Sequence, residues 1–254
     1  MSRDDTVSCV ALKKLSISSK TNCSWEVSSE ISSGTSYGIV YQACCQKDCR
    51  YILKYQKFNL TDEMRPYITA NTIKNEVEMQ NRAAEYDLAP IIYDSWLCDD
   101  GGVIIMAPMK KPVSLLLEIY KTLQVRKEII GAVFNIIEKL HSIGINHGDV
   151  HLDNIMVTYD KLPPSSTNEM KEYLDHDYVY KFIDFGVAED LKEKEKYKQM
   201  IGDYSKVTAW LGDAAAKRDP TLVFVYEYAE EKTRKLAITY GLIQEDLDSD
   251  EEWT

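Results

Sequence analysis

The sequence predicts an α+β protein with two lobes, a β-rich lobe followed by a helical one. Short β-type runs at 40–43, 51–55 and 103–106 fill the first part of the chain. An amphipathic helical pattern then covers 125–143, and residues beyond 191 read mainly as helix. We expect a terminal segment at 1–23, the β-rich lobe at 24–107, the helical lobe at 108–244 and an acidic tail at 245–254.

The β-rich lobe should contain one helix between its strands. A turn at 46–48 separates the first two strands, and the Gly101-Gly102 turn precedes the third, which reads as buried. The helix is predicted over 72–86. Asn71 or Thr72 would cap it, and the segment from Asp87 to Pro90 would end it.

The helical lobe is built around the 125–143 helix, whose apolar residues recur at helical spacing. Two buried strands, 155–157 and 180–183, flank a polar, Pro- and Ser-rich loop at 158–177 that we expect to be exposed. A strand-like run at 222–226 interrupts the later helices.

Composition excludes several classes of protein. A net charge of −11 over 254 residues argues against nucleic acid as the main ligand, because duplex binding needs a basic footprint. No apolar run approaches the roughly 20 residues that span a bilayer, and the N-terminus does not have the pattern of a secretory signal. We expect a cytoplasmic protein with no membrane partner.

Six cysteines are clustered mainly in the first fifth of the chain. In an intracellular protein they are expected to be free thiols rather than disulfides. The run from Cys44 to Cys49 has no second ligand pair at a zinc-like spacing, so a cysteine-rich turn is favoured over a metal site.

The strongest functional pattern is the run from His147 to Asn154. His147, Asp149 and Asn154, followed by the apolar strand 155–157, resemble the catalytic loop of protein kinases, and also that of aminoglycoside and choline kinases. The resemblance implies that Asp149 receives or orients the proton of an attacking hydroxyl. It also implies that Asn154 binds a metal ion and that His147 braces the loop.

A second pattern, Asp184-Phe185-Gly186, follows the strand at 180–183. An apolar strand that delivers an aspartate before a glycine turn resembles the kinase magnesium-binding segment. By this resemblance Asp184 is the main ligand of Mg²⁺ and acts with Asn154, and the protein uses ATP and Mg²⁺.

Lys54 lies inside an apolar strand, where a lysine needs a partner for its ammonium group. It resembles the small-lobe lysine that contacts ATP phosphates and should pair with a glutamate of the following helix. Counting 100° per residue from Ile73, Glu76 borders the apolar stripe, whereas Glu78 lies on the opposite side. We therefore choose Glu76.

The nucleotide-binding residues follow from the register of these motifs. Residues 32–40 stand where a glycine-rich loop belongs, but only Gly38 matches a family glycine, with Gly34 between the other two positions. The resemblance places the adenine between Val40 and Met156. It makes Met106 the gatekeeper residue and puts Met109 in the hinge.

Three features of the sequence differ from the usual protein-kinase pattern. Gly148 replaces an arginine that reads a phosphorylated activation loop, His151 replaces a lysine near the transferred phosphate, and no Ala-Pro-Glu-like element follows Asp184. The short end is similar to the KEOPS-complex and RIO kinases and to reduced kinases of large DNA viruses. We expect an atypical serine/threonine kinase acting on a protein substrate. A small-molecule kinase and a non-catalytic pseudokinase are the alternatives.

Overall fold

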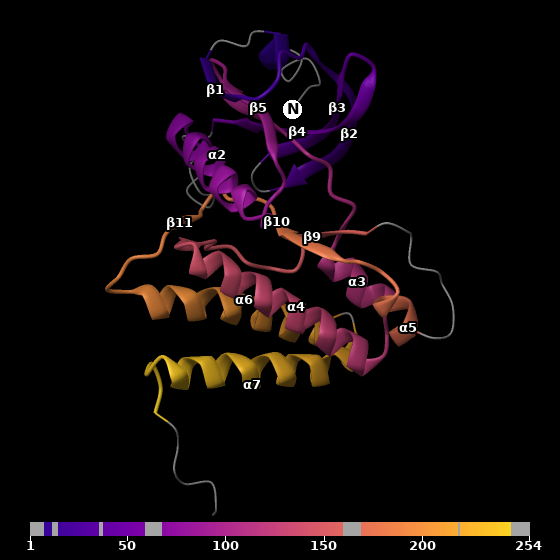
Figure 1. The fold of residues 1–254 in the computed structure, drawn as a ribbon, viewed down its shortest axis with the longest axis vertical. Coiled ribbons are helices and arrows are strands. Elements are labelled where there is room, and N and C mark those ends of the chain that lie inside the picture. Colours follow the sequence, from indigo (N-terminus) through magenta and orange to yellow (C-terminus); the bar gives the residue numbers. More distant parts are fainter. Residues whose placement is uncertain are drawn as a thin grey trace, which may run out of the picture.

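The computed structural model describes residues 8–11, 15–35, 38–58, 68–159, 169–217 and 219–244. The chain forms two lobes, with a β-sheet and helix α2 (Ala70–Glu85) in the upper lobe and mainly helices in the lower lobe (Figure 1). The predicted α+β class and the order of the two lobes are confirmed.

The small lobe is a six-stranded antiparallel sheet in the order β1-β5-β6-β4-β3-β2. β1 pairs with β5, so the predicted boundary at residue 24 divides one sheet: part of the expected terminal segment belongs to the lobe. The strands are β1 (Leu15–Ser19), β2 (Trp25–Thr35), β3 (Gly38–Cys45), β4 (Asp48–Lys57), β5 (Ile92–Leu97) and β6 (Gly101–Met106).

The two faces of β4 have different neighbours because side chains alternate along a strand. Leu53 and Tyr55 are buried in an aromatic-rich cluster on one face of the sheet. Lys54 is paired in register with Ile104, which packs in a second cluster on the other face, beside helix α2 (Ala70–Glu85). This alternation directs the Lys54 side chain toward α2.

Helix α2 begins two residues before the predicted start. Thr69 is the N-cap, and its side chain and that of Thr72 each accept a hydrogen bond from the other's backbone N–H. The prediction of Asn71 or Thr72 as the cap was wrong by two or three residues, because a Thr–Thr box differs from the common pattern with Glu or Gln. The helix ends before Asp87, which has φ of 61°.

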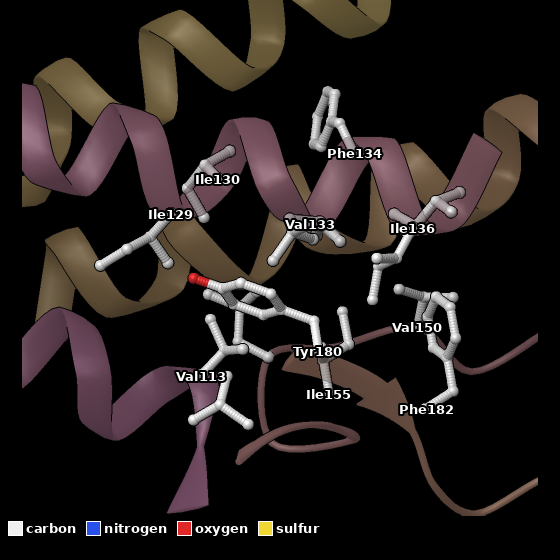
Figure 2. Close-up of a cluster of buried hydrophobic side chains, with 14 of the residues drawn as sticks. Val113, Ile129, Ile130, Val133, Phe134, Ile136, Val150, Ile155, Tyr180 and Phe182 are labelled. Carbon is white, nitrogen blue, oxygen red and sulfur yellow. The ribbon is translucent and has the colours of Figure 1, made fainter. Parts of the chain in front are cut away.

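The large lobe packs around helix α4, as the periodicity predicted. Figure 2 shows Ile129, Val133 and Ile136 of α4 directed toward a layer of apolar side chains from the neighbouring strands and loops, with Phe134 pointing away. The elements are β7 (Lys111–Pro112), α3 (Val113–Ile119), α4 (Leu123–Ser142), β8 (Ile145–Asn146), β9 (Ile155–Thr158), α5 (Glu169–Leu174), β10 (Val179–Phe182), β11 (Glu189–Asp190), α6 (Lys196–Lys217), η1 (Pro220–Leu222) and α7 (Val223–Thr239).

Two predictions for this lobe were wrong. Part of the expected exposed loop at 158–177 forms helix α5. Tyr173 of this helix stacks on Tyr178. The run at 222–226 begins helix α7 instead of forming a strand. Its Val225 and Ala229, four residues apart, are fully buried, so packing on the lobe overrides the β-propensity of the run.

The prediction of free thiols was also wrong. All six cysteines are paired, Cys9 with Cys98, Cys23 with Cys45 and Cys44 with Cys49, and all three disulfides lie in the small lobe. Cys44 and Cys45 are neighbours on β3, so they face opposite sides of the sheet and find different partners. The cysteine argument for an intracellular location therefore falls away.

The predicted turn between β3 and β4 is present, and Gln46 and Lys47 have the positive φ angles of a two-residue hairpin turn. Within the described residues, no helix is both long and apolar enough to cross a bilayer. The predicted acidic tail lies outside those residues.

Candidate active site

Lys54 and Glu76 form the buried pair that the helical phase predicted. Lys54 Nζ donates to Glu76 Oε1 at 2.7 Å, and the Gln56 side chain donates to Glu76 Oε2 at 2.9 Å. Glu76 is 1% exposed, whereas Glu78 is exposed to solvent. The pair ties β4 to α2 across the face of the sheet.

The same ammonium group reaches the large lobe. Lys54 Nζ donates to Asp184 Oδ1 at 2.7 Å, so one cation lies between two carboxylates. Burial alone would lower the pKa of Lys54, but the charges of Asp184 and Glu76 outweigh it and raise this pKa above the usual lysine value. Lys54 is therefore an ammonium at every physiological pH.

Asp184 follows β10 in an unusual backbone conformation. Its φ of 64° is left-handed, a conformation that costs a non-glycine residue about 1–3 kcal/mol and tends to occur at functional sites. The N–H of Ile183 donates to the carbonyl of Asn154 at 2.9 Å. This bond joins the Asp184 segment to the loop at 147–154.

His147 supports both segments from inside the large lobe. It is fully buried, its Nε2 lies 3.0 Å from the Ile183 carbonyl, and its ring packs against Phe182 and Phe185. The backbone N–H of Asp149 donates to its Nδ1 at 3.4 Å. Burial lowers the pKa of His147 below its usual value, so the neutral imidazole is favoured.

Asp149 lies at the surface of the loop and keeps an accessible carboxylate. Its side chain is 31% exposed. The Asn154 amide donates to the Asp149 carbonyl at 3.1 Å and to its Oδ2 at 3.4 Å. His151 Nε2 lies 4.0 Å from the same oxygen. The loop thus holds Asp149 in place from within and leaves its carboxylate open to solvent.

Asp203 of α6 anchors this loop and was not found by sequence reasoning. It is 1% exposed and accepts the N–H groups of His147 and Gly148, each at 3.1 Å. Its Oδ2 also lies 3.0 Å from His141 Nε2. The only sequence signal was an aspartate on the apolar stripe of an amphipathic helix, beside Tyr204 and Val207.

Gly148 has a backbone reason to be glycine. Its φ is 75°, and a Cβ there would lie 2.9 Å from the carbonyl oxygen of Val187. A left-handed residue pressed against a neighbouring carbonyl favours glycine on both counts. The arginine expected at this position does not fit the loop as it is folded here.

A cavity of about 540 Å³ opens between the lobes. Its polar and charged side chains are Lys54, Lys110, His151, Asp153, Asn154 and Asp184, and its remaining lining is apolar. Two of the predicted nucleotide-binding residues, Gly38 and Glu76, do not line the described part of this cavity. Glu76 lies behind Lys54. Of the predicted nucleotide-binding residues, the cavity is lined by Val40, Lys54, Met106, Met109 and Met156.

The predicted glycine loop is described in part. Gly34 lies near the end of β2, and Ser36 and Tyr37 fall outside the described residues. Gly38 has φ of 146°, and a Cβ there would meet the Tyr55 carbonyl at 2.4 Å. Close approach of β3 to β4 is thus sufficient to require glycine at residue 38.

The donor set around Asp184 fits magnesium. Asp184 and Asn154 line the same cavity and offer carboxylate and amide oxygens, the hard donors that Mg²⁺ prefers. Across the described residues, no group of three or more His, Cys, Asp or Glu side chains is arranged to hold a metal ion. The carboxylate of Asp184 and the amide oxygen of Asn154 suit Mg²⁺, which usually takes one or two protein carboxylates and completes its shell with water and phosphate oxygens.

Comparison with known proteins gives one family. The model described as protein kinase domain matches residues 25–206, well over half of the chain. The match spans both lobes and includes every residue of the arrangement described above. No curated protein shows significant sequence similarity to the chain.

Proposed function

The chain belongs to the family of protein kinase domains, and on that premise we propose that it is an ATP- and magnesium-dependent phosphotransferase, an atypical serine/threonine kinase acting on protein substrates. One observation carries the proposal. Lys54 bridges Glu76 and Asp184 at 2.7 Å each, and the loop bonded to the Asp184 segment presents Asp149 to solvent.

The nucleotide would occupy the cavity between the lobes. Its apolar lining suits an adenine ring, with Val40 and Met156 as the covering side chains and Met106 at the rear. Ala107 N–H is already bonded to the Ile91 carbonyl. The backbone N–H of Met109 forms no hydrogen bond within the described part of the chain, which leaves it for an adenine nitrogen.

The phosphates would lie at the polar end of this cavity, where the Lys54 ammonium is held by its two carboxylates. Asp184 and Asn154 would hold Mg²⁺, which supplies positive charge to the phosphate oxygens. The left-handed backbone of Asp184 and the Ile183–Asn154 bond fix these two side chains relative to each other. This fixed arrangement costs no reorganisation during the reaction.

Asp149 would act on the acceptor. A serine or threonine hydroxyl placed against its carboxylate is oriented toward the γ-phosphorus, and the hydroxyl proton passes to the carboxylate as the new oxygen–phosphorus bond forms. Asn154 keeps Asp149 in this position through two hydrogen bonds, and Asp203 holds the backbone before it.

The atypical assignment is supported by Gly148. Its conformation leaves no room for the arginine that reads a phosphorylated activation loop. Such a kinase is active without phosphorylation of that loop. Incubation with a phosphatase should therefore leave the transfer rate unchanged.

Transfer of label from γ-labelled ATP tests the proposal. The purified chain with Mg²⁺ should label itself or an added protein mixture on serine or threonine, and Asp184→Asn should lose magnesium-dependent nucleotide binding while remaining folded. Label transferred only to an added amino alcohol or aminoglycoside would assign the chain to small-molecule kinases instead. A chain that binds no nucleotide, with or without Mg²⁺, would be a pseudokinase and would overturn the proposal.

A further inference from the structure

Lys206 of α6 is fixed against the peptide group that precedes Asp149. Its ammonium donates to the Gly148 carbonyl, while Asp203, three residues earlier, accepts the Gly148 N–H at 3.1 Å. Residues three apart lie on the same face of a helix. One face of α6 therefore holds both polar groups of Gly148 and places a cation beside Asp149.

Lys206 lines a different cavity from the one that Lys54 lines. A second cavity, of about 640 Å³, is lined by Asp149, His151, Asp153 and Lys206 together with the α6 residues Ala209, Trp210, Asp213, Ala214 and Lys217. His151 and Asp153 also line the nucleotide cavity, so the two cavities meet at the catalytic loop. Asp149 lines the second cavity, so an acceptor placed against it there would lie next to the cavity that would hold the nucleotide.

Lys206 is the lysine of this second cavity whose charge remains available. Lys217 pairs with Asp213 at 2.9 Å. Lys206 is exposed, and none of the carboxylates that the structure describes forms an ion pair with it. His151 already has Asp149 and Asp153 as neighbours, at 4.0 and 3.8 Å.

The reaction needs positive charge on this side. The charge of the transferring phosphoryl group is spread over its three outer oxygens and must be neutralised as they move toward the acceptor. Lys54 is held between Glu76 and Asp184, on the nucleotide side. Asp149 and Asp153 add only negative charge at the acceptor side.

We propose that Lys206 is a catalytic residue whose ammonium contacts the phosphoryl group during transfer, a role supplied by α6 because the catalytic loop carries His151 two residues after Asp149. The inference rests on the proposed function. The acceptor oxygen forms a bond to the γ-phosphorus, the bond from that phosphorus to the bridging oxygen breaks, and ADP leaves with the electron pair. The acceptor proton goes to Asp149, and Lys206 neither gives nor takes a proton.

Steady-state phosphoryl transfer by the full chain, with ATP and Mg²⁺, tests this role. Lys206→Gln keeps a donor for the Gly148 carbonyl but removes the charge, and its kcat should fall about 10²-fold with KM for ATP unchanged, the usual effect of losing one charge-stabilising group. Lys206→Arg keeps the charge and should remain within about tenfold of wild type. Lys198→Gln, an exposed position on the same helix, is the control and should match wild type.

Binding measurements give a readout independent of turnover. Calorimetry with ADP and Mg²⁺ should give the same affinity for wild type and Lys206→Gln, whereas aluminium fluoride, which mimics the transferring group, should tighten ADP binding only in wild type and Lys206→Arg. A melting temperature equal to that of Lys198→Gln would separate the effect from loss of folding.

Three outcomes overturn the proposal. Equal kcat in wild type and Lys206→Gln would show that the charge is not needed, and equal losses in Lys206→Gln and Lys206→Arg would make Lys206 a support for Gly148 alone. A wild-type chain that binds nucleotide but transfers no phosphoryl group would overturn the proposed function itself, and this role with it.

Discussion

Glu76 Oε1 lies 2.7 Å from Lys54 Nζ, although the two residues come from different elements and are 22 positions apart. The two side chains are only 8% and 1% exposed, so each group depends on the other for compensation of its lost hydration. Lys54 carries the connection onward to Asp184 in the other lobe. Replacing Glu76 would therefore also affect the contact of Lys54 with Asp184 in the other lobe.

Replacing Glu76 with alanine should destabilise the protein by about 3 kcal/mol, because it leaves the buried Lys54 with one carboxylate and removes the acceptor for Gln56. Glu78→Ala, on the exposed side of the same helix, should change stability by no more than about 0.5 kcal/mol. Urea denaturation of both variants measures the difference. Equal losses of stability in the two variants would mean that the Lys54–Glu76 ion pair does not stabilise the protein.

The conformation of Gly148 should matter more than that of Gly144. Both are left-handed, but a Cβ on Gly144 meets nothing within 4 Å, whereas one on Gly148 lies 2.9 Å from Val187 O. Gly144→Ala should cost about 1 kcal/mol with activity retained. Gly148→Ala should cost about 2–3 kcal/mol and reduce transfer by at least about tenfold through displacement of Asp149. Similar activities of the two variants would contradict this account of the loop.

Protein stability should fall in mild acid because of His147. Burial holds its pKa in the folded state below the ordinary value of 6.5, so the unfolded chain binds more protons as pH falls. The free energy of unfolding should therefore decrease from about pH 6.5 toward the lowered native pKa and then level off with respect to this group. Urea midpoints at pH 7.5 and 5.5 measure the slope, which should be smaller in His147→Asn. An identical slope in that variant would rule out His147 as its source.

The disulfides should differ in their contribution according to the chain length that each encloses. Cys9 and Cys98 are 89 residues apart, and Cys44 and Cys49 only 5. The chain-entropy model gives about 4.5 kcal/mol for the long loop and about 2 kcal/mol for the short one. Thermal unfolding of the two double serine variants should rank them in that order. The reverse order would mean that local packing, and not the enclosed chain length, determines how much each disulfide stabilises the protein.

The central residues of the site were predictable because short-range rules fix them. Lys54 lies on a strand whose alternation sets its face, and Glu76 was separated from Glu78 by helical phase alone. The loop residues His147, Asp149 and Asn154 are close in sequence. They therefore lie close together in the folded chain, whatever the rest of the chain does. Asp184 follows directly from the strand that pairs with the one after Asn154.

The missed features depend on contacts between distant parts of the chain. Asp203 accepts hydrogen bonds from backbone N–H groups more than 50 positions away. Nearly every residue has a backbone N–H, so the sequence does not indicate which ones Asp203 binds. The disulfide between Cys9 and Cys98 joins positions 89 residues apart, a pairing that composition does not encode. Val225 is helical because it is buried against the lobe, against the preference of its own side chain.

The most direct test of the central claim compares the transfer rate of wild type and Asp149→Asn at saturating ATP and Mg²⁺. Asparagine keeps the size of the side chain and removes the group that receives the proton, so transfer should fall by at least about 10²-fold while nucleotide affinity and melting temperature stay at wild-type values. Transfer by Asp149→Asn at the wild-type rate would contradict the account, because the phosphotransferase activity would then reside elsewhere.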